Sequence, residues 1–105
     1  MKKIDLVQFD HIAVNSSNIQ ESISWYNKNF NIEVLYQDLS WGLIEVGNAK
    51  IAFVVSHQHP PHICFNVDKS NFDFSNSKFK KHRDGSSSKY IKDPDGNFIE
   101  LLKWN

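Results

Sequence analysis

Apolar and polar positions along the first half of the chain predict one strand, one helix and three further strands. The segment QFDHIAVN is typical of a strand, and polar residues after it introduce a helix that begins near Ser17 or Asn18. Asn18 followed by Glu21 is a capping-box pattern for the start of this helix. The apolar face of the helix is expected to consist of Ile19, Ile23, Tyr26 and Phe30. Three strands are expected after the helix, at 31–39, 40–47 and 49–56. The order is βαβββ.

The second half of the chain begins after the segment HQHPP at 57–61, because two prolines cannot lie in a central strand. We expect a strand at 62–68. Residues 69–88 are polar apart from three phenylalanines, which favours only a short helix and a weak strand. Two closing strands are joined at Asp95-Gly96-Asn97, a sequence typical of a hairpin.

Two segments recur after about half the length of the chain. HIAVN at 11–15 returns as HICFN at 62–66, and GNAKIAFVV at 47–55 returns in shortened form as GNFIELL at 96–102. Matches in the same order at a similar offset indicate an internal duplication. We therefore expect an α+β fold of two βαβββ modules in pseudo-symmetric pairing, the second with a reduced helix: module one at about 1–56, a linker at 57–61 and module two at about 62–105.

Composition narrows the classes of partner. A chain of 105 residues with 40% hydrophobic content supports a single domain. Twelve basic and twelve acidic residues cancel, so the charge excess of a nucleic-acid binder is missing. The sequence contains no run of about 20 apolar residues, and its single cysteine, Cys64, excludes an internal disulfide framework. We expect a cytoplasmic protein that binds neither nucleic acid nor a membrane and acts on a small molecule.

The last predicted strand carries a charge on an apolar face. Alternation places Phe98, Glu100 and Leu102 on one side of the strand. A carboxylate removed from water without a partner costs several kcal/mol, so Glu100 needs a cation or a hydrogen-bonding partner. In a pseudo-symmetric pair, His11 and His62 occupy equivalent places and are expected to converge with Glu100.

Two imidazoles and one carboxylate suit a divalent transition metal and leave coordination positions open for substrate. Aligning the repeats places Ala52 where Glu100 stands, so the first module would contribute His11 alone. In the alternative interpretation these residues have structural roles only. Glu100 would form a salt bridge with a lysine or arginine, and His11 and His62 would make local hydrogen bonds at the ends of their strands.

The segments FDHIAVNSSNIQESISWYNKNF, PHICFNVD and YIKDPDGNFIELL resemble the signature segments of the vicinal oxygen chelate superfamily. That superfamily includes glyoxalase I, fosfomycin-resistance proteins, extradiol dioxygenases, methylmalonyl-CoA epimerase and bleomycin-resistance proteins. The resemblance implies a cupped mixed sheet around a divalent metal, with His11, His62 and Glu100 at the ligand positions and a homodimer that shares its sites. It does not distinguish Mn, Fe, Ni, Zn or Co.

The chain resembles some members of this superfamily more than others. Glyoxalase I has a fourth ligand, a glutamate, where this chain has Ala52, and Glu45 lies one strand too early to replace it. The fosfomycin-resistance thiol transferases have three ligands of this kind. Their resemblance carries Lys80, Ser88 and Tyr90 onto substrate-binding positions and implies a possible thiol co-substrate.

Strand alternation allows Ser88 and Tyr90 to face the same cup, where both hydroxyls would bind an anionic substrate and Tyr90 would be the catalytic donor. Lys80 or Arg83 would add positive charge. The stretch also approaches the extradiol dioxygenase signature, with His82 as a candidate acid-base residue.

The sequence thus predicts a metal-dependent lyase or thiol transferase acting on an oxygen-chelating substrate. Two alternatives stay open besides the dioxygenase. One is a protein of the same fold that sequesters a drug or metabolite without turnover, and the other is a structural or regulatory subunit.

Overall fold

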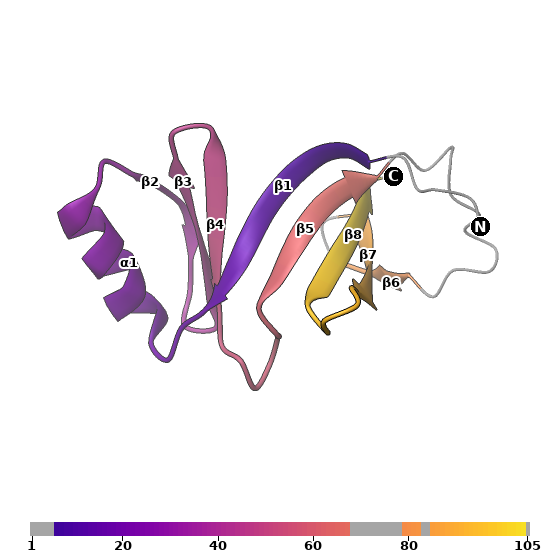
Figure 1. Cartoon of the computed structure of the whole chain (residues 1–105). Coiled ribbons are helices and arrows are strands. Elements are labelled where there is room, and N and C mark those ends of the chain that lie inside the picture. The colour runs from indigo at the N-terminus through magenta and orange to yellow at the C-terminus, as the bar shows by residue number, and fades with distance from the viewer. Residues whose placement is uncertain (1–5, 68–78, 83–84, 105) are drawn as a thin grey trace. The chain divides into compact units, whose positions relative to one another are not determined.

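A computed structural model of the chain describes residues 6–67, 79–82 and 85–104 (Figure 1). These residues form one α-helix and eight β-strands, which confirms the predicted α+β class. The chain divides into two compact units, a first unit at His11–His62 and a second unit made of Met1–Asp10 and Ile63–Asn105. In chain order the elements are β1 (Leu6–Asn15), α1 (Ile19–Asn29), β2 (Glu33–Gln37), β3 (Trp41–Val46), β4 (Ala49–Val54), β5 (His62–Val67), β6 (Lys80–Lys81), β7 (Ser86–Lys92) and β8 (Phe98–Trp104).

The helix begins where the capping pattern predicts. The side-chain oxygen of Asn18 accepts a hydrogen bond of 3.0 Å from the backbone N–H of Glu21, which satisfies one of the free donors of the first turn. The helix ends at Phe30, whose N–H donates to the carbonyl of Tyr26 at 2.9 Å. Its capping residues therefore fix both ends of α1.

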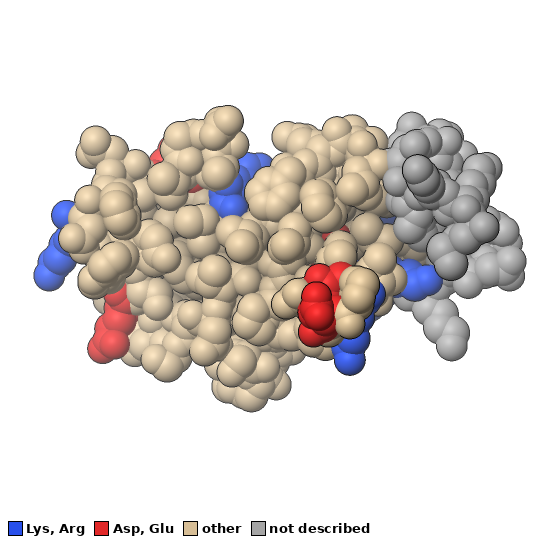
Figure 2. Space-filling model, in the orientation of Figure 1, with Lys and Arg blue, Asp and Glu red and all other residues tan. Residues whose placement is uncertain are grey.

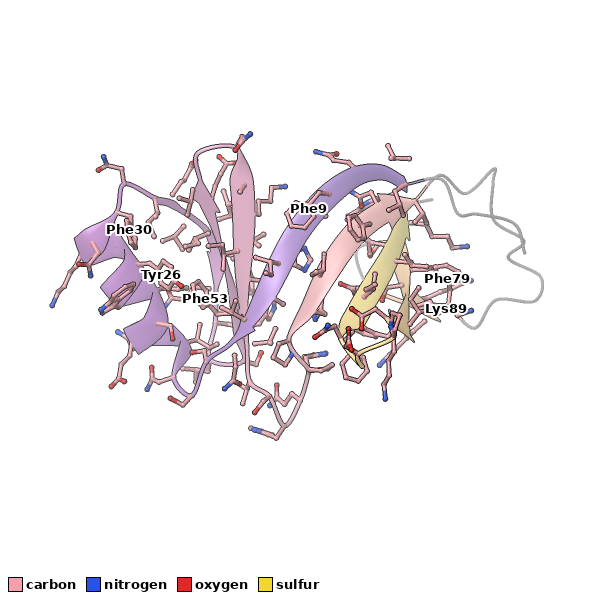
Figure 3. All side chains as sticks on the ribbon, in the orientation of Figure 1. Phe9, Tyr26, Phe30, Phe53, Phe79 and Lys89 are labelled. Atoms are coloured by element: carbon pink, nitrogen blue, oxygen red, sulfur yellow. The ribbon has the colours of Figure 1, made fainter. Side chains whose placement is uncertain are left out.

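In the first unit, the strands follow the order β2-β3-β4-β1. The β2–β3 and β3–β4 pairs are antiparallel, and β1 runs parallel to β4 with Ala13 opposite Ala52. Helix α1 packs on one face of this sheet, where the side chain of Tyr26 meets the ring of Phe53 with centroids 5.1 Å apart (Figure 3). The buried core between helix and sheet consists of Ile19, Ile23, Ile44 and Phe53.

A glycine allows the helix to approach β3 closely. A Cβ atom at Gly42 would lie 2.6 Å from Cδ1 of Ile23 and 3.1 Å from Cγ2 of Ile19. Separations of this kind are below van der Waals contact, so the helix side chains occupy the space that a larger residue would need. Gly42 is therefore part of the packing between α1 and the sheet.

In the second unit, the first residues of β1 form the edge of a sheet segment whose strand order is β1-β5-β8-β7-β6. The side-chain amide of Asn66 donates to Asp10 at 3.0 Å, and the rings of Phe9 and Phe65 make an edge contact at 5.8 Å between centroids. The order β5-β8-β7-β6 repeats the order β1-β4-β3-β2 of the first unit, as the duplicated segments predict. The weak strand expected within 69–88 is β6, and much of that stretch, where the short helix was also expected, lies outside the described residues.

The β7–β8 hairpin is closed by the side chain of Asp93. Its carboxylate accepts hydrogen bonds of 2.9 Å from the backbone N–H groups of Asp95 and Asn97 and from the side-chain amide of Asn97. Gly96 has a φ of 86°, a left-handed conformation that favours glycine. The DPDGN segment therefore forms the turn that fixes the pairing of β7 with β8.

The surface carries no dominant charge on the face seen in Figure 2, where scattered acidic and basic side chains lie among uncharged ones. This agrees with the balanced count of acidic and basic residues. Within the described ranges, no helix is both long and apolar enough to cross a membrane.

The Asp93 turn gives a pH-dependent prediction. The side chain and backbone N–H of Asn97 hold the pKa of Asp93 below its usual value. A lowered folded-state pKa stabilises the protein above the unfolded-state pKa of about 3.9, and this contribution is lost as the pH falls through the folded-state pKa. We expect Asp93→Ala to lower the melting temperature at neutral pH and to lose this difference in strong acid.

Asp95→Ala is the matched control, because the Asp95 carboxylate makes none of the hydrogen bonds that close this turn. Thermal unfolding followed by circular dichroism at several pH values measures the effect. Equal melting temperatures for the Asp93 and Asp95 variants at neutral pH would contradict the role given to Asp93.

The close packing at Gly42 gives a second prediction. Gly42→Ala should lower the free energy of unfolding by about 1–3 kcal/mol through overpacking. Ile23→Val removes the Cδ1 atom that the new Cβ would meet, so the double variant should lose less stability than the sum of the two single variants. Denaturant unfolding of the four proteins measures this coupling, and strictly additive effects would refute the contact.

Candidate metal centre

His11 and His62 meet within the first unit. Their Nε2 atoms lie 3.4 Å apart, and their rings meet edge to face with centroids separated by 5.4 Å. His11 comes from β1 and is half-buried, whereas His62 opens β5 and is only 7% exposed. Two histidines 51 residues apart in the chain, at equivalent places in the repeat, are therefore brought together.

The hydrogen bonding of His62 sets its tautomer. Its Nδ1 lies 2.8 Å from the carbonyl oxygen of Pro60. A carbonyl only accepts, so Nδ1 carries the hydrogen and the neutral ring presents the lone pair of Nε2 toward His11. A carbonyl behind one ring nitrogen is the usual support of a metal-binding histidine.

The spacing of the pair fits a shared metal ion. Two nitrogens bound at about 2.1 Å to one tetrahedral ion lie about 3.4 Å from each other. The observed 3.4 Å agrees with that value and is longer than the 2.7–3.2 Å typical of N–H···O hydrogen bonds. Imidazole nitrogens of this kind suit transition metals and zinc.

Small side chains line the sheet face that His11 shares. Alternation along β1 places His11 and Ala13 on the same side, and Ala13 is paired with Ala52. A small cluster of Ala13, Ala52 and Val54 is buried there, away from the core under α1. Ala52, which the repeat aligns with Glu100, has no side-chain atom that could bind a metal.

Glu100 lies in the second unit, on β8. It is half-buried and directly opposite Tyr90 on β7. On the neighbouring strand β5, the fully buried thiol of Cys64 makes a side-chain hydrogen bond to the Glu100 carboxylate. Burial, together with the negative charges of Glu100 and Asp10, raises the pKa of Cys64 far above its usual value. Cys64 is therefore a neutral donor to Glu100.

Tyr90 shares a face with Glu100 and Ser88. Opposed residues of an antiparallel pair project to the same side, and Ser88 lies two positions from Tyr90 on β7. Burial, and then the nearby Glu100 carboxylate, raise the pKa of Tyr90 above its usual value. The phenol therefore keeps its proton at neutral pH.

The remaining predicted binding residues are placed unequally. Lys80 lies opposite Ser88 across the β6–β7 pair and is exposed. Arg83 falls outside the described residues. Ser88 is buried, at 4% exposure, and its hydroxyl lies 2.7 Å from Nε2 of His82.

Two contacts were missed by the sequence interpretation. By itself the Cys64 residue indicates only that no internal disulfide forms, although the repeat aligns Cys64 with Ala13 and Glu100 with Ala52, and Ala13 and Ala52 lie side by side in the first unit. His82 was considered only for dioxygenase chemistry, and the sequence carries no signal for its bond to Ser88.

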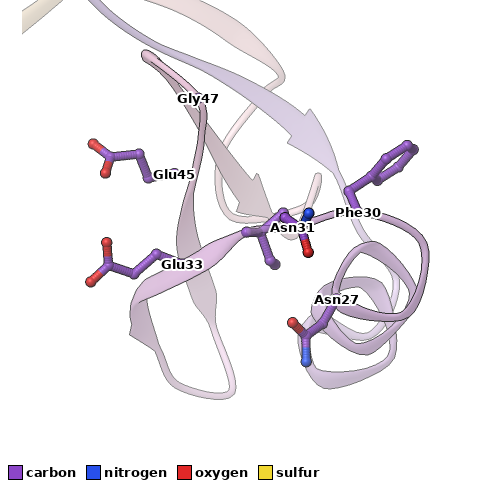
Figure 4. Close-up of a pocket in the computed structure, with 7 residues that line it drawn as sticks. Asn27, Phe30, Asn31, Glu33, Glu45 and Gly47 are labelled. Atoms are coloured by element: carbon purple, nitrogen blue, oxygen red, sulfur yellow. The ribbon is translucent and has the colours of Figure 1, made fainter.

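Glu45 lines a separate pocket of the first unit. This pocket has a volume of about 380 Å³ and lies between the end of α1 and strands β2 and β3 (Figure 4). Glu45 is paired with Glu33 across the two strands, and both carboxylates border the pocket together with Phe30 and Asn31.

Comparison with known proteins identifies the fold. No family model matches the chain. Methylmalonyl-CoA epimerase from Mycobacterium tuberculosis is similar in structure over 100% of this chain and 93% of its own, with a TM-score of 0.73 and 13% identity. A variant of the Streptomyces coelicolor methylmalonyl-CoA epimerase, in complex with 2-nitronate-propionyl-CoA, matches with a TM-score of 0.69 and 14% identity over 95% of this chain and 99% of its own.

A third similar structure is a glyoxalase/bleomycin resistance protein/dioxygenase superfamily member from Vibrio splendidus. It has a TM-score of 0.65 and 12% identity over 89% of this chain and 96% of its own. At these identities the likeness is one of fold. The chain has the fold of the vicinal oxygen chelate proteins, as its three signature segments predicted.

Proposed function

We propose that this chain is a divalent-metal-dependent enzyme of the vicinal oxygen chelate type, with His11, His62 and Glu100 as the protein ligands. The observation that carries the proposal is the pair of Nε2 atoms 3.4 Å apart, with the lone pair of His62 held toward His11 by the Pro60 carbonyl. A pair of structural histidines needs neither the metal-like spacing nor that tautomer.

The repeat supports Glu100 as the third ligand. In the first unit Ala13 lies opposite Ala52, and the aligned residues in the second half are Cys64 and Glu100, which are joined by a side-chain hydrogen bond. His62 precedes Cys64 by two residues on β5, so both side chains lie on one face of that strand. A carboxylate that is half-buried in a strand is stabilised when it also binds a cation.

The protein side chains have distinct roles in this proposal. A divalent cation of this kind supplies a Lewis acid for the two neighbouring oxygens of the substrate. Tyr90 keeps its proton and donates to an oxygen on which negative charge develops. Ser88, Lys80 and Arg83 bind the anionic part of the substrate. Cys64 holds the Glu100 carboxylate by its thiol hydrogen bond.

The motifs favour a lyase or a thiol transferase, the latter with a thiol co-substrate. Two of the similar structures are epimerases, which adds epimerisation to the classes that deserve testing. A homodimer with shared sites is the expected assembly.

Metal content tests the proposal. Elemental analysis of protein purified without chelator should find about one transition metal per chain in the wild type and none in Glu100→Ala or His62→Ala. Matched controls are Glu45→Ala, another half-buried strand carboxylate, and His57→Ala, a linker histidine. Both controls should keep the metal.

An empty wild type, even after reconstitution with Mn, Fe, Co, Ni and Zn, would contradict the proposal. A protein of the same fold that binds a drug or metabolite without metal would then be the better description. Metal retained in Glu100→Ala but lost in His62→Ala would remove Glu100 from the ligand set.

Activity tests the role of Tyr90. A screen with epoxides, 2-oxoaldehyde hemithioacetals, catechols and acyl-CoA thioesters, with and without a thiol, covers the reaction classes above. For the substrate found, Tyr90→Phe should lower kcat by about 10²-fold with little change in KM, because the donor acts on charge that develops in the transition state. Tyr36→Phe is the control, because it removes a hydroxyl on β2 that donates to Asp38. An unchanged kcat in Tyr90→Phe would exclude the catalytic role.

A further inference from the structure

His82 has no role in the proposed metal chemistry, but its side chain pairs with that of Ser88. Nε2 of His82 lies 2.7 Å from Oγ of Ser88. The backbone holds His82 in place from both sides, because its N–H donates to the Ser86 carbonyl at 2.8 Å and its carbonyl accepts from the N–H of Gly85 at 3.2 Å. Two backbone hydrogen bonds therefore hold His82 beside the start of β7, where its ring meets Ser88.

This pair lies on the face that carries the proposed substrate-binding groups. The backbone bond of His82 to Ser86 continues the β6–β7 pairing, so the side chain of His82 projects to the same side as Ser88. The charged and titratable groups of this face are Lys80 on β6, Tyr90 and Lys92 on β7, Glu100 on β8 and, on the neighbouring strand β5, Cys64. Arg83 follows His82 in the chain and lies outside the described residues.

The surroundings of Ser88 decide which atom donates. Ser88 is buried, and its cross-strand partners are Lys80 on β6 and Leu102 on β8. A lysine ammonium has no acceptor and a leucine has no polar atom. Since a buried hydroxyl normally donates its hydrogen to a partner, the neutral imidazole of His82 is the acceptor that Ser88 meets.

Protonation of His82 reverses this hydrogen bond. An imidazolium has two N–H donors and no acceptor, so Nε2–H then donates to Oγ of Ser88. The hydroxyl hydrogen of Ser88 is released and can donate to another oxygen. Ser88 thus offers only lone pairs when His82 is neutral, and a hydrogen-bond donor when His82 is charged.

We propose that His82 is a positioning residue that sets the hydrogen-bond polarity of Ser88, so that Ser88 donates to an oxyanion only when His82 is protonated. The oxyanion is the anionic group of the substrate, and in this respect the inference rests on the proposed function. The His82–Ser88 pair itself exists without metal. Its experiments therefore fail or succeed independently of metal content.

The first experiment observes the tautomer of His82 directly. Long-range ¹H–¹⁵N NMR of the imidazole rings in chelator-treated protein should show neutral His82 with its hydrogen on Nδ1 and a free lone pair on Nε2. Ser88→Ala should shift the Nε2 resonance, whereas Ser87→Ala, a buried neighbour on the opposite side of β7, should not. A neutral ring with the hydrogen on Nε2 would overturn the proposal, because His82 would then donate to Ser88 at every pH.

The second experiment measures binding of inorganic sulfate, whose charge is constant across the range in which histidine titrates, about pH 5 to 8. Titration followed by NMR or calorimetry should show sulfate affinity about tenfold higher at the acid end in the wild type, the size expected for one hydrogen bond to a charged acceptor. His57→Gln is the control for a general effect of histidine charge and should keep this rise.

Ser88→Ala distinguishes two explanations of the rise in sulfate affinity: a hydrogen bond donated by Ser88, and electrostatic attraction of sulfate to the charged His82 ring. This variant keeps the charge of His82 and loses only the hydroxyl, so its sulfate affinity should be nearly independent of pH, as in His82→Gln. A rise of wild-type size in Ser88→Ala would overturn the proposal and assign the effect to His82 charge alone. Absence of sulfate binding by the wild type at every pH would overturn it equally.

Discussion

The register between β7 and β8 is the constraint on which the proposed site depends. Asp93 gathers three hydrogen bonds at the hairpin turn, and the pairing that follows places Tyr90 directly opposite Glu100. A slip of one residue would turn Glu100 to the other face of the sheet. The DPDGN segment therefore has a structural role: it fixes the register that places Tyr90 opposite Glu100.

The two halves of the duplicated chain use one strand order for different purposes. In the first unit the Ala13–Ala52 pair leaves the face beside His11 small and apolar, while α1 covers the core on the other face. In the second half the aligned pair is Cys64 and Glu100, a buried thiol that donates to a carboxylate. A change of two side chains at equivalent positions converts a packing contact into a charged one.

Many features of the fold and of the candidate site could be predicted from the sequence because they depend on local motifs or on strand alternation. The helix cap at Asn18, the left-handed Gly96 and the common face of Ser88, Tyr90 and Glu100 follow from short motifs and from alternation. The His82–Ser88 bond could not, because His82 lies outside the regular strands and alternation therefore does not predict where its side chain points. Nor does the sequence show that the Pro60 carbonyl fixes the tautomer of His62.

X-ray absorption spectroscopy of the metal-loaded protein is the most direct test of the central claim, which is that His11, His62 and Glu100 hold one divalent ion. The account predicts two imidazole ligands and otherwise oxygen in the first coordination sphere of the ion. Sulfur scattering would identify Cys64 as a ligand and contradict the account, as would a first coordination sphere without imidazole.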